Sequence, residues 1–194
     1  MNYFEIVANR EALMFIRSAA SLFAFAAFTS VLCAQNPPAP PKPGPEQQKL
    51  AFFAGRWTSE GEMKPGPMGP GGKVSGTDVC EWFQGGFHLV CRSEGTSPMG
   101  AMKSLGILGY DSDRKRYTYY GVDNSGMGAT DMAYGQVSGD TWTWEMETTM
   151  GGQPVKQRYV AKQVSPDSYT FEFSMAQGNG PWAVMMTGTE TRAK

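Results

Sequence analysis

Apolar and polar residues alternate along most of the chain after residue 55. Residues 141–147 read Thr-Trp-Thr-Trp-Glu-Met-Glu, and residues 170–175 read Thr-Phe-Glu-Phe-Ser-Met. A period of two places the apolar side chains of a segment on one face of a β-strand and the polar side chains on the other. Strands with one apolar and one solvated face are typical of antiparallel pairing around a single interior.

Segments of this kind recur about every 8–12 residues, with turn-forming residues between them. About ten strands are more than an open sheet usually carries without curling. The sequence therefore predicts an all-β fold, a closed antiparallel up-and-down β-barrel of about ten strands. The predicted strands lie near residues 56–64, 73–84, 87–97, 100–110, 115–122, 127–138, 140–149, 154–164, 168–177 and 181–192.

A short helix is predicted before the first strand, and a loop after it. Residues 45–53 can form the helix, because proline suits a first helical turn and Gly55 ends the helix. Leu50, Phe53 and Ala54 would then face one end of the barrel. Residues 63–72 contain too much glycine and proline for a strand and are expected to form an exposed loop.

Residues 1–34 are predicted to be a secretory signal peptide. A basic residue precedes a short apolar run that ends in small residues. Met14 is the expected true start, because a signal that begins there has a shorter segment before its apolar run. The apolar run is shorter than the about 20 residues that span a membrane, so no stable membrane span is expected after cleavage. Lipid attachment at Cys33 is disfavoured, since a small residue would be expected in place of Leu32.

Cleavage would leave a proline-rich linker at residues 35–45 and a barrel domain at residues 46–194. Proline at this density favours an extended, solvated spacer. The whole chain has a formal net charge of −1. Residues 1–34 contain as many basic as acidic residues, so cleavage leaves this charge unchanged. A nearly neutral chain offers no basic field to a nucleic-acid backbone, and nucleic acid is not an expected partner.

Cys80 and Cys91 lie symmetrically about the pair Gly85-Gly86. Two glycines can take the positive φ angles that a two-residue hairpin turn needs, and a turn centred there places the cysteines directly opposite each other. Facing residues in antiparallel strands have Cα atoms about 4.5–5.5 Å apart, which is within disulfide range. Because an exported chain meets an oxidising compartment, we predict a disulfide. A reduced, buried pair is the alternative.

Four motifs follow one another through the barrel domain. They are Leu50-x-x-x-x-Gly55-x-Trp57, Trp82-Phe83-Gln84-Gly85-Gly86-Phe87, Leu105-Gly106-x-Leu108-Gly109-Tyr110-Asp111 and Thr189-Glu190-Thr191-Arg192. In this order they resemble the bacterial domain-of-unknown-function family 1579, which is grouped with the calycins, the lipocalin-like barrels. The resemblance covers roughly residues 45–192 and implies a barrel with an internal cavity and no established activity. It also implies that Arg192 packs across Trp57 at the barrel floor, a contact worth about 0.5–2 kcal/mol.

His88 is the single histidine of the chain, which limits metal and nucleophilic chemistry. Some ten-stranded relatives in the barrel group that the chain resembles bind haem through a histidine of a later strand, whereas His88 comes early. A structural zinc site needs four Cys or His ligands. We therefore expect no cofactor and no metal. A base at His88 would need a serine such as Ser93 or Ser104 nearby, and the sequence contains no Gly-x-Ser-x-Gly nucleophile elbow.

Glutamates are plentiful, and most alternate with apolar neighbours, so we expect them on the solvated outer face. They are Glu60, Glu62, Glu81, Glu94, Glu145, Glu147 and Glu172. Asp111 is expected to form a turn. A carboxylate that instead faced inward beside the tryptophans, without a partner, would have a raised pKa and would favour an enzyme.

Aromatic and methionine side chains are expected to line an apolar cavity, because they adapt to irregular ligands. The candidate ligand-binding residues are Trp82, Tyr110, Trp144, Met146, Phe171, Phe173 and Met186. The first hypothesis is a periplasmic or secreted module that binds a small apolar or amphipathic ligand and is not an enzyme. The alternatives are a filled barrel that contacts a partner through residues 63–72, and a hydrolase-type enzyme that uses a buried carboxylate.

Overall fold

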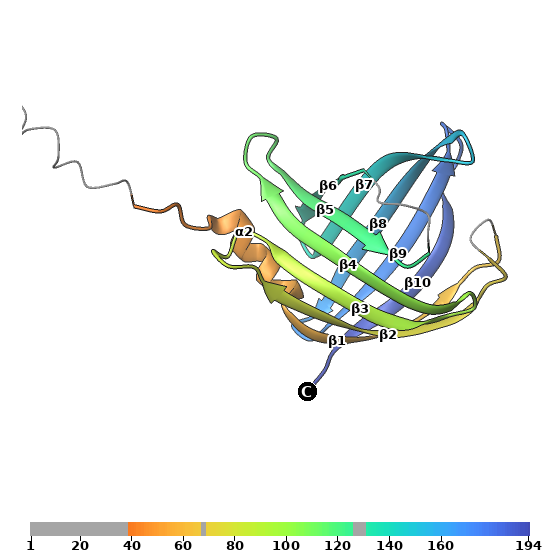
Figure 1. The fold of residues 1–194 in the computed structure, drawn as a ribbon, viewed down its shortest axis with the longest axis horizontal. Coiled ribbons are helices and arrows are strands. Elements are labelled where there is room, and N and C mark those ends of the chain that lie inside the picture. The colour runs from red at the N-terminus through yellow and green to blue at the C-terminus, as the bar shows by residue number, and fades with distance from the viewer. Residues whose placement is uncertain (1–38, 67–68, 126–130) are drawn as a thin grey trace, which may run out of the picture. The chain divides into compact units, whose positions relative to one another are not determined.

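Ten antiparallel strands close into a barrel in the computed structural model, which describes residues 39–66, 69–125 and 131–194. Each strand pairs with its neighbours in sequence, and β1 pairs with β10 to complete the ring (Figure 1). The strands are β1 Gly55–Met63, β2 Gly72–Trp82, β3 Leu89–Ser97, β4 Gly100–Asp111, β5 Arg116–Asp123, β6 Ala133–Ser138, β7 Thr141–Met150, β8 Gln153–Ser165, β9 Ser168–Gln177 and β10 Ala183–Arg192. The predicted closed, up-and-down barrel is confirmed. The predicted signal peptide, residues 1–34, lies outside the described residues.

The predicted strand boundaries agree with the observed ones within two residues, except at β6. The strand expected at 127–138 begins at Ala133, and residues 126–130 lie outside the described part of the chain. This strand pairs with β5 only between Tyr117↔Gly135 and Tyr119↔Ala133. Sequence alternation alone does not show where such pairing stops.

The strand register determines which residues face the interior. Trp57 lies opposite Asp78 on β2 and opposite Arg192 on β10. Its side chain is 1 % exposed, so Trp57 marks the inner face of β1. Because side chains alternate along each strand, Ser59 shares this inner face, and the residues paired with it face inward too.

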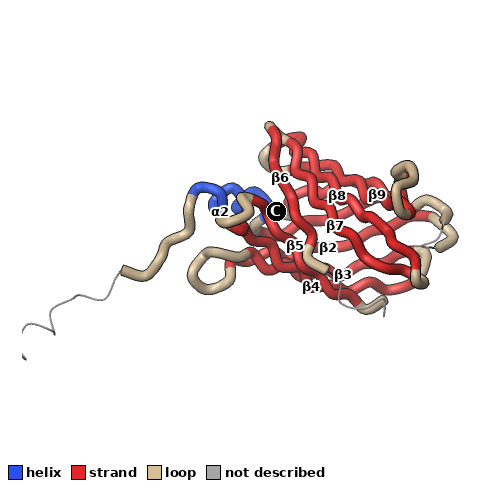
Figure 2. The backbone as a smooth tube through the Cα atoms, turned by 90° about the horizontal axis from the view of Figure 1, so that it is seen from above, coloured by secondary structure: helices blue, strands red, loops and turns tan. Residues whose placement is uncertain are grey.

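Two short helical segments close one end of the barrel, as Figures 1 and 2 show. The predicted helix at 45–53 is an α-helix, α2 (Pro45–Lys49), followed by a 3₁₀ turn, η1 (Leu50–Phe53). Leu50 and Phe53 are buried, as predicted, and Phe53 packs edge-on against Trp142, Trp144 and Tyr169. We call this the helical end. The opposite end, where the turns 98–99 and 151–152 lie, is the far end.

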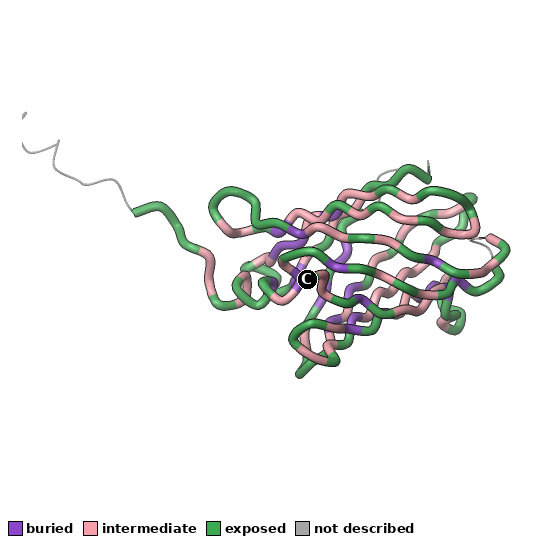
Figure 3. Tube along the Cα trace, turned by 90° about the horizontal axis from the view of Figure 1, so that it is seen from below, coloured by how far each residue is buried: buried purple, intermediate pink, exposed green. Residues whose placement is uncertain are grey.

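Buried residues are concentrated towards the helical end (Figure 3). The main core cluster contains η1, Trp57 and aromatic residues from β5, β7 and β9. Towards the far end, Met102, Met146 and Met186 occupy inward-facing positions but remain partly accessible to solvent. The barrel is therefore densely packed at the helical end, whereas beyond its middle some inward-facing side chains are buried, such as Met63, and others remain partly accessible.

Cys80 and Cys91 form a disulfide across β2 and β3, with Cα atoms 4.0 Å apart. The predicted bond and register are confirmed, but the turn is longer than the two residues expected. The strands separate after Trp82, and the loop is closed by hydrogen bonds from Phe83 N to His88 O and from Gly86 N to Phe83 O, of 2.8 and 2.9 Å. A disulfide is compatible with a periplasmic or extracellular location. None of the described helices is long and apolar enough to cross a membrane.

Candidate functional site

Two carboxyl groups lie inside the barrel on the strands that flank β1. Asp78 on β2 is opposite Trp57, and Glu190 on β10 is opposite Ser59. Both pairings place the carboxylates on the inner face of the wall. Glu190 is 5 % exposed, which is rare for a glutamate because its charge loses hydration.

The interior contains polar atoms without protein partners. Ser93 Oγ donates a hydrogen bond to Asp78 Oδ1. Glu190 Oε2 is buried and has no hydrogen-bond partner, and the same holds for Trp144 Nε1 on β7. An unpaired buried polar group costs about 1–3 kcal/mol, so these two atoms are where a bound molecule would gain most from a hydrogen bond.

Burial changes the protonation of the carboxyl pair. Burial, reinforced by the neighbouring Asp78 carboxyl and partly offset by Ser59, raises the pKa of Glu190 from 4.5 to about 8. Burial also raises the pKa of Asp78, against the hydrogen bond from Ser93. Two carboxyls that share one desolvated site do not both ionise readily. At neutral pH Glu190 is therefore mostly protonated.

Three tyrosines face the carboxyl pair from β5, β8 and β9. Burial raises the pKa of Tyr119, Tyr159 and Tyr169, and the negative charge of Asp78 raises each of them further. The three hydroxyls therefore remain protonated. They provide neutral hydrogen-bonding groups around a site whose charge is negative.

Tyr119 also shows that the middle of the barrel contains free space. Its ring lies over two facing glycines, since a Cβ atom at Gly106 would come within 2.7 Å of the ring and one at Gly121 within 2.6 Å of the hydroxyl. Although it shares the inner face with the buried Leu108 opposite it, Tyr119 is 36 % exposed. Its exposed area therefore faces the interior.

The predicted ligand-binding residues fall into two groups. Trp144 and Phe171 are buried in the inner wall, and Tyr159 stacks on Phe171 with ring centroids 6.0 Å apart. Met146, Phe173 and Met186 occupy inward-facing positions and are partly accessible. These five residues line one interior.

The other two predicted residues lie at the helical end. Trp82 is the last residue of β2 and is 38 % exposed. Tyr110 packs against Tyr117, with ring centroids 5.1 Å apart. Strand position separates both residues from the partly accessible side chains beyond the middle of the barrel.

Arg192 closes the barrel floor in the way that the resemblance implies. Its guanidinium lies 4.2 Å from the centre of the Trp57 ring. It also donates hydrogen bonds to Ala54 O at 2.6 Å and Phe52 O at 3.0 Å. Gly55 has a φ of 117°, and a Cβ atom there would lie 2.7 Å from the guanidinium. The floor therefore requires glycine at this position.

His88 and Ser93 are not brought together. The histidine ring covers Gly109 on β4, where a Cβ atom would lie 2.7 Å from it. Ser93 is five positions along the chain, about 16 Å in an extended strand, and on the opposite face. Within the described residues, no group of three or more His, Cys, Asp and Glu side chains could hold a metal ion.

Sequence reasoning did not single out Asp78 and Glu190 as site residues, although a signal for both was present. Glu190 is two residues from Arg192, which was expected over Trp57, and Asp78 is two residues from Cys80. A period of two places each carboxylate on the same face as its neighbour. The glutamates predicted to be solvated are exposed, apart from Glu172, which is half-buried and accepts a hydrogen bond from Ser174 at 2.8 Å.

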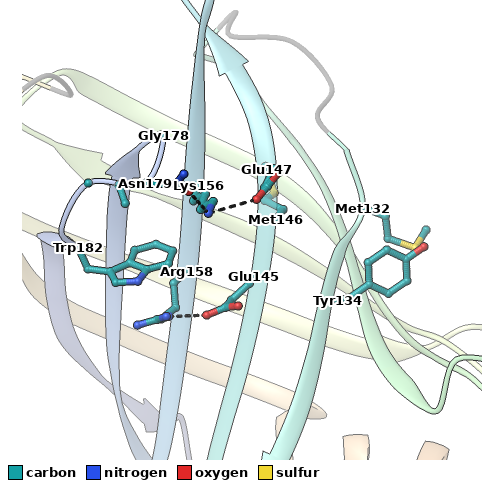
Figure 4. A pocket seen from close by; sticks show the side chains of 12 residues that line it. Met132, Tyr134, Glu145, Met146, Glu147, Lys156, Arg158, Gly178, Asn179 and Trp182 are labelled. Atoms are coloured by element: carbon teal, nitrogen blue, oxygen red, sulfur yellow. Dashed lines mark hydrogen bonds and ion pairs between the residues drawn. The ribbon is translucent and has the colours of Figure 1, made fainter.

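A hollow of about 680 Å³ lies across β6 to β9 and is lined mainly by outward-facing side chains, together with Met146 (Figure 4). Its charged side chains pair with one another. Arg158 contacts Glu145 at 2.6 Å and stacks 3.9 Å from the Trp182 ring. Lys156 contacts Glu147 at 3.6 Å. Because these charged side chains already have partners, a ligand in this hollow would not supply a missing hydrogen bond, as it would at Glu190.

Comparisons with known proteins identify a family and support the fold. Residues 42–192 match the family described as "Protein of unknown function (DUF1579)". The crystal structure of Rv2717c from M. tuberculosis is similar, with a TM-score of 0.56, 15% identity, and coverage of 79% of this chain and 100% of that one. The structure of EF1p2_mFAP2b bound to DFHBI has a TM-score of 0.42 and 12% identity, and covers 76% of this chain and 98% of that one. No curated protein matches the chain in sequence.

Proposed function

The chain belongs to the DUF1579 family of proteins of unknown function, and we propose that it binds a small amphipathic molecule inside its barrel. The apolar part of the ligand would contact Met146, Phe173 and Met186. Its polar group would reach the carboxyl pair Asp78 and Glu190. Binding in this arrangement requires no covalent chemistry.

One observation carries this proposal: Glu190 is 5 % exposed, and its Oε2 atom has no hydrogen-bond partner. A side chain that only filled the core would be apolar or fully paired, because an unpaired polar group destabilises the fold. A ligand that supplies the missing hydrogen bond would recover this energy. The exposure of Tyr119 towards the interior supports the presence of space for such a ligand.

The proposal includes a calycin-like barrel and export from the cytoplasm. The Gly55-x-Trp57 floor with Arg192 across it supports the calycin assignment. The disulfide between Cys80 and Cys91 supports an oxidising compartment. Determining the N-terminus of the mature protein by mass spectrometry tests export, with cleavage after Ala34 as the expected result.

Native mass spectrometry of protein recovered from its own host tests ligand binding. We expect an added mass that is lost on unfolding. Met186→Trp should remove it by filling the interior, whereas Val184→Trp should keep it, because Val184 is on the same strand and is exposed. A bare parent protein, or a mass retained in Met186→Trp, would contradict the proposal.

A second candidate function is general acid–base catalysis. The observation that favours it is again Glu190, an inward-facing carboxyl whose Oε2 atom has no hydrogen-bond partner and whose pKa of about 8 suits proton transfer near neutral pH. The two functions predict different molecules bound to the Glu190→Gln variant. A carrier would bind the same molecule as the parent, whereas an enzyme would accumulate an unconverted substrate of different mass.

A further inference from the structure

The carboxyl pair also indicates which class of ligand the barrel accepts, and this inference rests on the function proposed above. Asp78 and Glu190 lie on either side of β1 in the desolvated middle of the barrel. Glu190 Oε2 is buried and unpartnered. An acceptor in such a position calls for a hydrogen-bond donor, and the nearby charge determines which donor fits best.

The surroundings of the pair contain negative charge and no free cation among the described strand residues. Arg192 is the basic strand residue on the inner face, and its guanidinium is occupied by Trp57, three backbone carbonyls and Asp167, which lies 3.1 Å away. The other strand lysines and arginines fall on outward-facing positions: Arg56, Lys73, Arg92, Lys103, Arg116, Lys156, Arg158 and Lys162. Among the described strand residues, the pair therefore has no counter-ion.

Neutral and aromatic groups complete the site. Ser59 lowers the pKa of Glu190, and the negative charge of Glu190 raises the pKa of Tyr159 and Tyr169. Ser93 donates a hydrogen bond to Asp78. Aromatic ring faces attract cations by about 0.5–2 kcal/mol each, more strongly when water is excluded. The inner wall is rich in such rings, and none of these groups would neutralise an anionic ligand.

We propose that Asp78 and Glu190 anchor the cationic head of an alkylammonium-type amphiphile, an amine carried on an apolar chain. The ammonium would donate hydrogen bonds to Glu190 Oε2 and to the Asp78 carboxylate. Its charge would be balanced by the one negative charge that a half-protonated carboxyl pair retains. A carboxylate head in the same position would meet like charge without a counter-ion, so the barrel excludes fatty-acid-type ligands.

Three probes that share one alkyl chain and differ in their head group separate this proposal from general amphiphile binding. They are octylamine, octan-1-ol and octanoate, each titrated into the protein at pH 7 by calorimetry. We expect octylamine to bind the parent at least tenfold more tightly than the other two. Equal affinity for octan-1-ol would overturn the cationic inference and leave amphiphile binding intact. Tighter binding of octanoate would also overturn it, and no binding of any probe would overturn the proposed function as well.

Matched double variants show whether the carboxyl pair is responsible. The preference for octylamine should fall below about twofold in Asp78→Asn/Glu190→Gln. A single substitution is not sufficient, because the remaining carboxyl can still carry the charge. Glu60→Gln/Glu62→Gln removes two exposed carboxylates from the outer face of β1 and should keep the preference. A preference that survives the inner double variant would refute the proposed anchor, and the probe ranking in the parent tests the inference even without that variant.

Discussion

Replacing Glu190 by glutamine should stabilise the protein increasingly as pH rises. Burial raises the pKa of this carboxyl from 4.5 to about 8, so the folded chain holds a proton that the unfolded chain releases. The stability contributed by that proton is fully present below about pH 4.5 and is lost as pH rises through about 8. Glutamine keeps the shape of the side chain and a donor towards Asp78, but it does not titrate.

The size of the effect follows from the pKa difference. Each pKa unit corresponds to about 1.4 kcal/mol of differential interaction between the two protonation states. The parent therefore loses about 3 kcal/mol by pH 7 and about 5 kcal/mol well above pH 8, relative to acid conditions. This loss is large against the about 5–15 kcal/mol that stabilises a typical domain.

Urea unfolding, followed by tryptophan fluorescence at pH 5, 6, 7 and 8, measures this pH-dependent loss of stability. The free energy of unfolding of Glu190→Gln minus that of the parent should rise by about 3 kcal/mol between pH 5 and pH 8. Glu60→Gln, on the exposed face of β1, should follow the parent at every pH. A Glu190→Gln difference that stays constant within about 0.5 kcal/mol would show that Glu190 is ionised in the folded protein and would refute the reasoning.

Three further variants test the barrel floor and the disulfide. Trp57→Ala should lower the free energy of unfolding by about 3–5 kcal/mol in urea, and a midpoint equal to that of the parent would mean that the ring does not support the floor. Arg192→Lys should cost about 1–3 kcal/mol, because lysine cannot donate to both Phe52 O and Ala54 O while stacking on the ring; an unchanged melting temperature would contradict this. Cys80→Ser/Cys91→Ser should cost about 2–4 kcal/mol, and reduction of the parent should reproduce the loss; a double variant as stable as the oxidised parent would show that the disulfide is dispensable.

Much of the fold could be predicted because its signals are local. The alternation in 141–147 marks an amphipathic strand wherever its partners lie. Gly85-Gly86 centres a hairpin and therefore pairs Cys80 with Cys91, even though the actual turn is longer than two residues. The start of β6 was missed, since it depends on where pairing with β5 stops.

The candidate site was predicted less well. Five expected lining residues, among them Trp144 and Met186, share the interior, because alternation already places them on apolar faces. Trp82 and Tyr110 carry the same pattern but lie at the helical end, since position along the barrel axis depends on strand stagger. The carboxyl pair was missed because a glutamate among threonines is expected on the solvated face of a strand. Only the structure shows which of the two alternating faces points inward.

The sequence by itself determined most of the strands, the alternation of two faces along the clearly amphipathic ones and the cysteine pairing, since each depends on residues that are neighbours in the chain. Only the tertiary structure decided that β10 closes on β1, which brings Glu190 and Asp78 to the two sides of one strand. The protonation of Glu190 and its need for a partner arise from the loss of water around both carboxyls. That loss is a property of the closed barrel and not of any segment of it.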